Sequence, residues 1–410
     1  MWQVAILSLA TVGAVDVDVR TLDQRSVSGS LTELSAERIV VTHQGKSVSI
    51  PAAELLSLMP RRGAETASAA KSSPSESGLW VELIDGSRLL ARELSLDGAH
   101  ATLSLGTQTV RLSTATIRSV ELQSVTDPVA KRWAELRAAK ATADRLVVRR
   151  SEQTIDSMEG TVRKLTPDTL HFELDGDVAK VRRTKVFGFL LYRPGDRRVD
   201  DVVAYVDEVT KTRWAASRLQ LEKDGLRLVT SAGLEVVRPW SSIVRLDFSA
   251  GKIQYLSDLE PEAVTWTPLV ASAALTPEFE SFFRPRRDRA LRGGSLQLAK
   301  SENGRRTIQS FDKGLALHSR TRLVYRLPSS FRTFTAVAGI DARMKGAGGV
   351  RLEILADEKR LFDRTIRGAD EPVPLSFDVQ GAGRLTIVVD FGDDGDVADH
   401  LDLCDARLAR

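Results

Sequence analysis

The chain has very little cysteine: Cys404 is the only one among its 410 residues. A lone cysteine excludes an intramolecular disulfide, and it excludes a zinc site built from several cysteine thiolates. The fold must therefore be stabilised by buried apolar side chains, which a 42% hydrophobic composition can supply.

An excess of charge of one sign is also missing. The 58 basic and 55 acidic side chains leave a net charge of +3. This balance does not support electrostatic binding of the whole chain to nucleic acid or to an acidic membrane surface. The strands also lack the basic residues interleaved with exposed aromatics that an RNA-binding surface needs. We therefore expect no nucleic-acid partner.

After the N-terminus, no apolar run approaches the roughly 20 residues of a membrane helix, so no transmembrane segment is expected. Residues 1–14 are apolar and end in Val12-Gly13-Ala14, the small-residue form of a signal-peptidase site. The run is short and no basic residue precedes it, which indicates either a misplaced start codon or the first strand of the fold. A cleaved signal peptide over residues 1–14 stays an open prediction beside these two. We predict an extracytoplasmic protein: periplasmic, on the cell surface, or secreted.

Catalytic signatures are absent as well. The sequence contains no Gly-x-Ser-x-Gly elbow, no His-Glu-x-x-His, no phosphate loop and no dinucleotide glycine fingerprint. Two carboxylates such as Asp393 and Asp399 suffice in principle for glycoside cleavage, but these two lie on one loop. We therefore expect no enzyme activity.

What the first three fifths of the chain does contain is period-two alternation. Val15, Val17 and Val19 alternate with charged residues, as in an antiparallel strand with one buried face. The same order of strands, glycine turns and polar breaks recurs, which predicts an internal repeat. An Ala- and Ser-rich segment, 61–78, is expected to be a linker. The predicted small β-barrel units are residues 15–60, 79–123, 145–194 and 202–250.

One helix is expected, over residues 127–143. Asp127 is the predicted N-cap, Pro128 suits the first helical position, and Trp133 and Leu136 follow at helical spacing. Each barrel unit resembles a five-stranded Sm-like or SH3-like barrel. That fold binds RNA, peptides or other barrels in different families, so we expect a stalk or a scaffold for a protein partner.

The last part of the chain, 253–410, carries a series of motifs in a fixed order. These motifs are Tyr255–Leu259, the Lys-Gly-Leu-x-x-His-Ser run at Lys313–Ser319, Gly339–Asp341, and the closing segment from Asp390 to Leu408. Together they resemble the NPCBM family of carbohydrate-binding modules. The resemblance implies a galactose-binding-like β-sandwich with a jelly-roll arrangement, and a glycan or polysaccharide as partner. Alternating runs such as Arg322–Leu327 agree with sandwich strands.

Sugar binding requires polar groups for hydroxyls and an aromatic platform for the C–H face. His318 also has a simpler interpretation, a hydrogen bond to a neighbouring loop. His400 lies between carboxylates in the sequence, which predicts a raised pKa and a structural ion pair. The polar candidates are His318, Ser319, Arg320, Asp341, Asp399 and His400.

The aromatic platform is the weak point of this hypothesis. No tryptophan follows Trp266. Members of the resembled family commonly show Asp-His-x-Asp-Trp near the end, and here Leu403 stands at the Trp position. The difference weakens sugar stacking if that position contacts ligand, and matters little if it is a core position.

An acidic loop near the end offers hard oxygen ligands, which suit calcium. Its spacing is not that of an EF-hand, so a solvated loop is the alternative interpretation. The candidate metal ligands are Asp390, Asp393, Asp394 and Asp396.

The sequence therefore predicts an all-β chain: a C-terminal jelly-roll sandwich preceded by several small β-barrel units and one helix. Two functions stay open. The first is non-catalytic carbohydrate binding through the C-terminal module; the second is a structural or protein-interaction scaffold without glycan binding. A concave face with His318 and Arg320 exposed favours the first, and packing of both under loops favours the second.

Overall fold

The computed structural model describes residues 15–23, 25–61, 78–106, 108–193, 202–267, 283–302, 305–392 and 395–410. It consists of two compact units, Met1–Ala250 and Gly251–Arg410. The candidate signal peptide, 1–14, lies outside the described residues, as does nearly all of the predicted linker 61–78. In the described part of the chain, no helix has the length and apolar character needed to cross a membrane.

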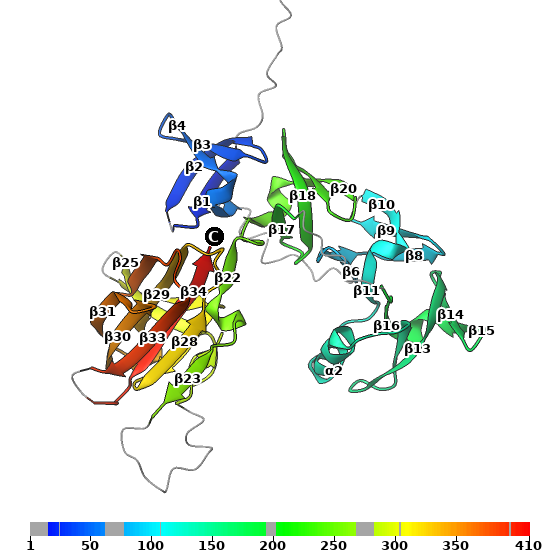
Figure 1. Ribbon diagram of the computed structural model, residues 1–410. Helices are drawn as coiled ribbons and strands as arrows, with labels where there is room; N and C mark the ends of the chain where they lie inside the picture. Colours follow the sequence, from blue (N-terminus) through cyan, green and yellow to red (C-terminus); the bar gives the residue numbers. More distant parts are fainter. Residues whose placement is uncertain are drawn as a thin grey trace, which may run out of the picture. The chain divides into compact units, whose positions relative to one another are not determined.

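Four copies of one strand arrangement make up the N-terminal unit (Figure 1). In the first, third and fourth copies, the first four strands pair antiparallel in chain order. In the second copy a bend at Arg92 divides the second strand in two; the first part pairs with the strand before it and the second part with the strand after it. One turn of 3-10 helix then precedes the last strand, which returns to pair with the first. The chain therefore contains an internal structural repeat. The resemblance of each copy to an Sm-like or SH3-like barrel stays a prediction.

The first strands of the first two copies, Val15–Thr21 and Leu79–Leu83, follow the predicted alternation, because every second side chain enters the core. The first copy comprises β1 (Val15–Thr21), β2 (Ser26–Leu34), β3 (Arg38–His43), β4 (Lys46–Pro51) and β5 (Leu55–Pro60). The second comprises β6 (Leu79–Leu83), β7 (Arg88–Ala91), β8 (Glu93–Asp97), β9 (His100–Leu105), β10 (Gln108–Ser113) and β11 (Ile117–Glu121).

The helix α2 (Asp127–Ala138) connects the second and third copies. It begins where predicted, but Thr126 rather than Asp127 occupies the N-cap position, and it ends before residue 143. The early end has a local cause: the backbone of Ala139 is extended, and the Arg145 guanidinium binds the carbonyl oxygens of Leu136 and Lys140.

The third copy comprises β12 (Asp144–Arg149), β13 (Ile155–Leu165), β14 (Thr169–Leu174), β15 (Asp177–Arg182) and β16 (Val186–Leu190). The fourth comprises β17 (Ala204–Glu208), β18 (Arg213–Glu222), β19 (Gly225–Thr230), β20 (Glu235–Pro239) and β21 (Ile243–Asp247).

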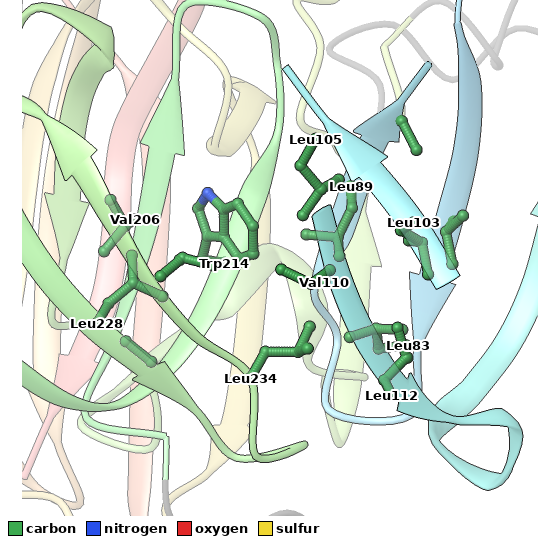
Figure 2. Packing of buried hydrophobic residues seen from close by; sticks show 14 of the residues in the cluster. Leu83, Leu89, Leu103, Leu105, Val110, Leu112, Val206, Trp214, Leu228 and Leu234 are labelled. Carbon is green, nitrogen blue, oxygen red and sulfur yellow. The ribbon is translucent and has the colours of Figure 1, made fainter. Parts of the chain in front are cut away.

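The copies are joined by strand pairing and by a shared core. β5 pairs with β21, β7 with β18, and β11 with β16, so the copies connect in the order first, fourth, second, third. Figure 2 shows Trp214 and Leu234 of the fourth copy facing Leu89 and Val110 of the second. The repeats therefore form one packed unit.

The C-terminal unit is a sandwich of two antiparallel sheets, and the all-β fold class is confirmed. Buried aliphatic and aromatic side chains from both sheets fill the space between them. In one sheet the strand order is β24 (Arg286–Arg287), β27 (Gly314–His318), β34 (His400–Ala409), β29 (Thr333–Ile340) and β32 (Val373–Asp378). The short strand β22 (Ile253–Tyr255) also pairs with β34. In the other sheet the strand order is β23 (Ala263–Trp266), β28 (Thr321–Arg326), β33 (Arg384–Phe391), β30 (Gly349–Ala356) and β31 (Lys359–Arg367). A hairpin of β25 (Leu296–Glu302) and β26 (Arg305–Phe311) completes the unit.

Candidate functional site

Two histidines meet at the end of the sandwich where β27 stops and β34 begins. The pairing of these strands places His318 directly opposite His400. Their ring centroids are 5.8 Å apart at an interplanar angle of 70°. Both side chains are buried, with exposed fractions of 4% and 8%. The two candidates predicted from separate motifs thus form one pair.

Two aromatic rings continue from this pair toward the surface. The ring of Phe283 meets His318 edge-on, with centroids 4.7 Å apart. Trp266, the last residue of β23, stacks parallel to Phe283 with centroids 5.8 Å apart. Trp266 and Phe283 are both half-buried. We call Trp266, Phe283, His318 and His400 the aromatic row.

The sequence hypothesis missed Trp266 and Phe283 as site residues, because they are far from His318 along the chain. Pairing of β23 with β28 places Trp266 opposite Thr321, three residues after His318. One sequence signal could have indicated Trp266. It is the last tryptophan of the chain, and a segment rich in phenylalanine and arginine, 279–292, follows it.

Arg320 is the one exposed residue among the six polar candidates. It lies in the turn between β27 and β28 with a left-handed φ of 58°. Its guanidinium lies 5.9 Å from the ring centroid of Phe391, and its carbonyl oxygen accepts a hydrogen bond from the Thr267 amide at 3.2 Å. Ser319 is buried, with its hydroxyl 3.2 Å from Nδ1 of His318. The turn thus places one cation beside the aromatic row.

Both imidazoles of the row are uncharged at neutral pH. Burial lowers the pKa of His318. Burial lowers the pKa of His400 to about 4, together with repulsion from the Arg292 cation and from His318 when that ring is protonated. The prediction of a raised pKa for His400 is therefore wrong: the one carboxylate that raises it, Asp341, does not outweigh burial.

The two candidate aspartates of the site have structural partners. Asp341 caps a turn of 3-10 helix (Ala342–Met344), and both its oxygens pair with the Arg343 guanidinium at 3.0 and 3.1 Å. Asp399 accepts a hydrogen bond from the Gly349 amide at 3.2 Å. Both are buried, so neither presents its carboxylate to solvent.

A further buried carboxyl, which the sequence hypothesis did not include, lies two residues after His400. Asp402 accepts a hydrogen bond from the Gln297 amide at 3.0 Å. Burial, together with the negative charge of Asp341, raises the pKa of Asp402 to about 8. At pH 7 it is largely protonated, so the sandwich end contains two imidazoles and one carboxyl that are mostly neutral.

The acidic loop is only partly described. Asp390 is exposed and accepts a hydrogen bond from the Phe391 amide, and Asp396 is half-buried near His318. Asp393 and Asp394 lie outside the described residues. Among the residues that the structure does describe, no group of three or more His, Cys, Asp or Glu is placed to hold a metal ion. Calcium binding stays a prediction.

Leu403 occupies an interior position. It is fully buried in the sandwich core and lies opposite Leu315 and Ala338 in the neighbouring strands. Leucine at this position therefore changes the core rather than removing an exposed aromatic platform.

Comparison with known proteins finds similarity to the C-terminal unit. Residues 254–409 match the NPCBM/NEW2 domain family. No curated protein matches the chain. Among solved structures, a CBM51 module from Clostridium perfringens GH95, in complex with methyl-galactose, is 25% identical and has a TM-score of 0.33; the match covers 38% of this chain and 99% of that one.

Two further matches are longer proteins of which only part is covered. CBM51-2 and the INT domains of Clostridium perfringens ZmpB, in complex with GlcNAc, are 21% identical over 50% of this chain and 43% of that one, with a TM-score of 0.33. The tandem CBM51 modules of a family 98 glycoside hydrolase from Streptococcus pneumoniae are 19% identical over 38% of this chain and 47% of that one, with a TM-score of 0.32.

Proposed function

We propose that the C-terminal unit is a non-catalytic carbohydrate-binding module that recognises a glycan at the aromatic row. The match of residues 254–409 to the NPCBM/NEW2 domain family supports this function. The observation that carries the proposed site is the parallel stack of Trp266 on Phe283 at the sandwich end. An aromatic face of this kind packs against the C–H face of a sugar ring.

The other residues have distinct roles in this proposal. Arg320, exposed beside Trp266, donates hydrogen bonds to sugar hydroxyls. His318 supports Phe283 from the interior and is itself supported by His400. Because both imidazoles are neutral, no charge has to be desolvated beneath a neutral sugar.

A scaffold function without glycan binding is the second candidate, and the burial of the predicted residues favours it. His318, Ser319, Asp341, Asp399 and His400 are all buried, and Asp341 is already paired with Arg343. In this alternative the row merely closes the end of the sandwich core.

The proposal extends to the rest of the chain. The repeated copies of the N-terminal unit serve as a scaffold for a protein partner, and the protein acts outside the cytoplasm, where polysaccharides are accessible. The hydrophobic core that the four copies share supports a rigid spacer rather than a flexible tether.

A glycan-array screen of the full chain tests the function. The Trp266→Ala variant removes the outer ring of the row. The Trp80→Ala variant is the matched control, because Trp80 is a half-buried tryptophan of the N-terminal unit with Arg88 over its ring. We expect binding to at least one glycan class, with Trp266→Ala weakening it on the order of tenfold, or about 1.4 kcal/mol, and Trp80→Ala leaving it unchanged.

Two results would contradict the proposal. A correctly folded chain that binds no glycan would favour the scaffold, and equal losses in both variants would remove the site from the aromatic row. The same screen in calcium and in EDTA tests the calcium prediction, which requires that EDTA weakens binding or stability.

A further inference from the structure

The N-terminal unit contains a cavity of about 810 Å³ that plays no part in the proposed glycan site. It lies where β11 of the second copy pairs with β16 of the third, beside the C-terminal end of α2. Ile84, Leu136, Leu190 and Leu191 contribute aliphatic lining. The volume is within the usual range of ligand sites, roughly 300 to 1,000 Å³.

Positive charge dominates the lining. Four cationic side chains, Arg118, Arg137, Lys140 and Arg193, face one carboxylate, Glu82. Glu82 already forms an ion pair with Arg137 at 2.7 Å and accepts a hydrogen bond from the Ser119 hydroxyl at 3.0 Å. Glu82 therefore neutralises Arg137 and leaves the other three cations uncompensated from within the cavity.

Arg118 and Lys140 are exposed at the rim of the cavity. Neither side chain has an ion-pair partner in the part of the chain that the structure describes. Both are therefore available to an anionic group of a ligand.

Arg193 is the third cation, and it is half-buried. Its guanidinium donates hydrogen bonds to the carbonyl oxygens of Tyr192 and Thr114, and its buried Nε has no partner among the described residues. Burial lowers the pKa of Arg193. The nearby Asp144 carboxylate partly offsets this, but its oxygens accept hydrogen bonds from the Val162 and Tyr192 amides. A ligand carboxylate would compensate this partly desolvated charge.

The chemistry of the lining selects the class of ligand. Exposed Tyr192 is the single aromatic residue among the lining residues, so the cavity lacks the flat platform on which sugars and bases stack. Aliphatic lining under a cationic rim instead suits aliphatic side chains alternating with carboxylates. We propose that this cavity binds an acidic peptide segment of a partner protein.

Fluorescence anisotropy on the full chain tests the proposal at low salt. The probe is a labelled, end-blocked octapeptide of alternating glutamate and leucine, and its control alternates glutamine and leucine. The double variant Arg118→Gln with Lys140→Gln removes the two rim cations. The matched double variant Arg111→Gln with Lys131→Gln removes one exposed arginine and one exposed lysine outside the cavity lining.

We expect the glutamate peptide to bind and the glutamine peptide not to bind. The rim double variant should weaken binding by about tenfold or more, because two charge-assisted contacts are lost, while the matched double variant stays within about twofold. Glycan binding through Trp266 should be the same in both double variants, which separates this proposal from the proposed glycan function.

Several outcomes would overturn the proposal. Absence of peptide binding would do so, and equal weakening in both double variants would indicate general charge attraction. If a heparin hexasaccharide bound instead, with the same loss in the rim double variant, the cavity would belong to an anionic glycan rather than a peptide.

Discussion

A buried carboxylate of the N-terminal unit and two buried ionisable groups of the C-terminal unit are compensated in different ways. In the N-terminal unit, the buried carboxylate of Glu208 accepts two hydrogen bonds from the Arg238 guanidinium, at 2.5 and 3.0 Å. It also accepts one from the Trp214 indole N–H at 3.1 Å. At the sandwich end of the C-terminal unit, His400 and Asp402 have no ion-pair partner among the residues that the structure describes, and their pKa values move to about 4 and about 8.

This difference illustrates two ways in which a protein can accommodate a buried ionisable side chain. A buried carboxylate stays ionised where a cation and further donors compensate it. Without such partners, the group shifts its pKa and becomes neutral instead. Glu208 in the repeats therefore keeps a paired charge, whereas His400 and Asp402 at the sandwich end are mostly neutral at neutral pH, close to the ion pair of Asp341 and Arg343.

The largest expected effect comes from breaking the paired arrangement. Arg238→Ala leaves the buried Glu208 carboxylate without its cation. We expect a loss of about 3 kcal/mol in the free energy of unfolding, the lower end of the range for a broken buried pair, because the Arg238 side chain is 20% exposed. Urea unfolding followed by tryptophan fluorescence measures it. A loss below about 1 kcal/mol would show that Glu208 does not depend on this pair.

The second prediction concerns the pH dependence of the C-terminal unit. The folded pKa of Asp402, about 8, exceeds its ordinary value of 3.8, so the folded state binds more protons between these values and stability falls as pH rises through this window. His400, lowered from 6.5 to about 4, has the opposite effect, and stability rises with pH between those values. Above about pH 6.5 the Asp402 effect remains alone, with a slope of about 1 kcal/mol per pH unit up to about pH 8.

Asp402→Asn should remove this slope, because the amide stays neutral. Asp405→Asn is the matched control on the same strand, since Asp405 is only half-buried and pairs with Arg407. Calorimetric unfolding of the full chain between about pH 6.5 and pH 8 measures the slopes. An unchanged slope in Asp402→Asn would assign the pH dependence to another group.

A smaller effect is expected where a buried carboxylate is compensated by backbone amides. Asp85, in the turn after β6, accepts hydrogen bonds from the Ser87 amide at 2.8 Å and from the Ala232 amide of the fourth copy at 2.9 Å. Asp85→Asn loses one acceptor oxygen, so we expect a loss of about 1 kcal/mol in the free energy of unfolding by urea. An unchanged free energy of unfolding would show that the contact between the second and fourth copies does not depend on both oxygens of Asp85.

The smallest effect should come from an exposed pair. Arg227 contacts Glu222 and Glu235 on the surface of the N-terminal unit, and such pairs contribute little. Arg227→Ala should leave the thermal midpoint of unfolding unchanged within error. A clear decrease would weaken the distinction between buried and exposed pairs.

The local alternation of apolar and polar residues was sufficient to predict where strands lie, but not which strands pair with each other. The Val15–Val19 alternation predicts a strand because its period matches the pleat, and the structure has β1 there. Leu403 could not be placed from the sequence, because its burial depends on which strands flank β34.

The site was harder to predict for the same reason. The pKa of His400 was predicted from its sequence neighbours, whereas burial and the opposing His318 set it. Trp266 joins the site only because β23 pairs with β28. Two separate sequence motifs identified the histidines, whereas strand register determines which residues surround them.

Two buried imidazoles, unprotonated at neutral pH, support the aromatic row from the interior of the sandwich. NMR titration of the histidine ring carbons in the full chain, with His318→Gln and His400→Gln to assign the signals, tests this claim directly. We predict that both rings titrate below the ordinary histidine value, His400 near pH 4. Titration of either ring at or above about pH 6.5 would contradict the claim, because it would show a solvated or ion-paired imidazole at this end of the sandwich.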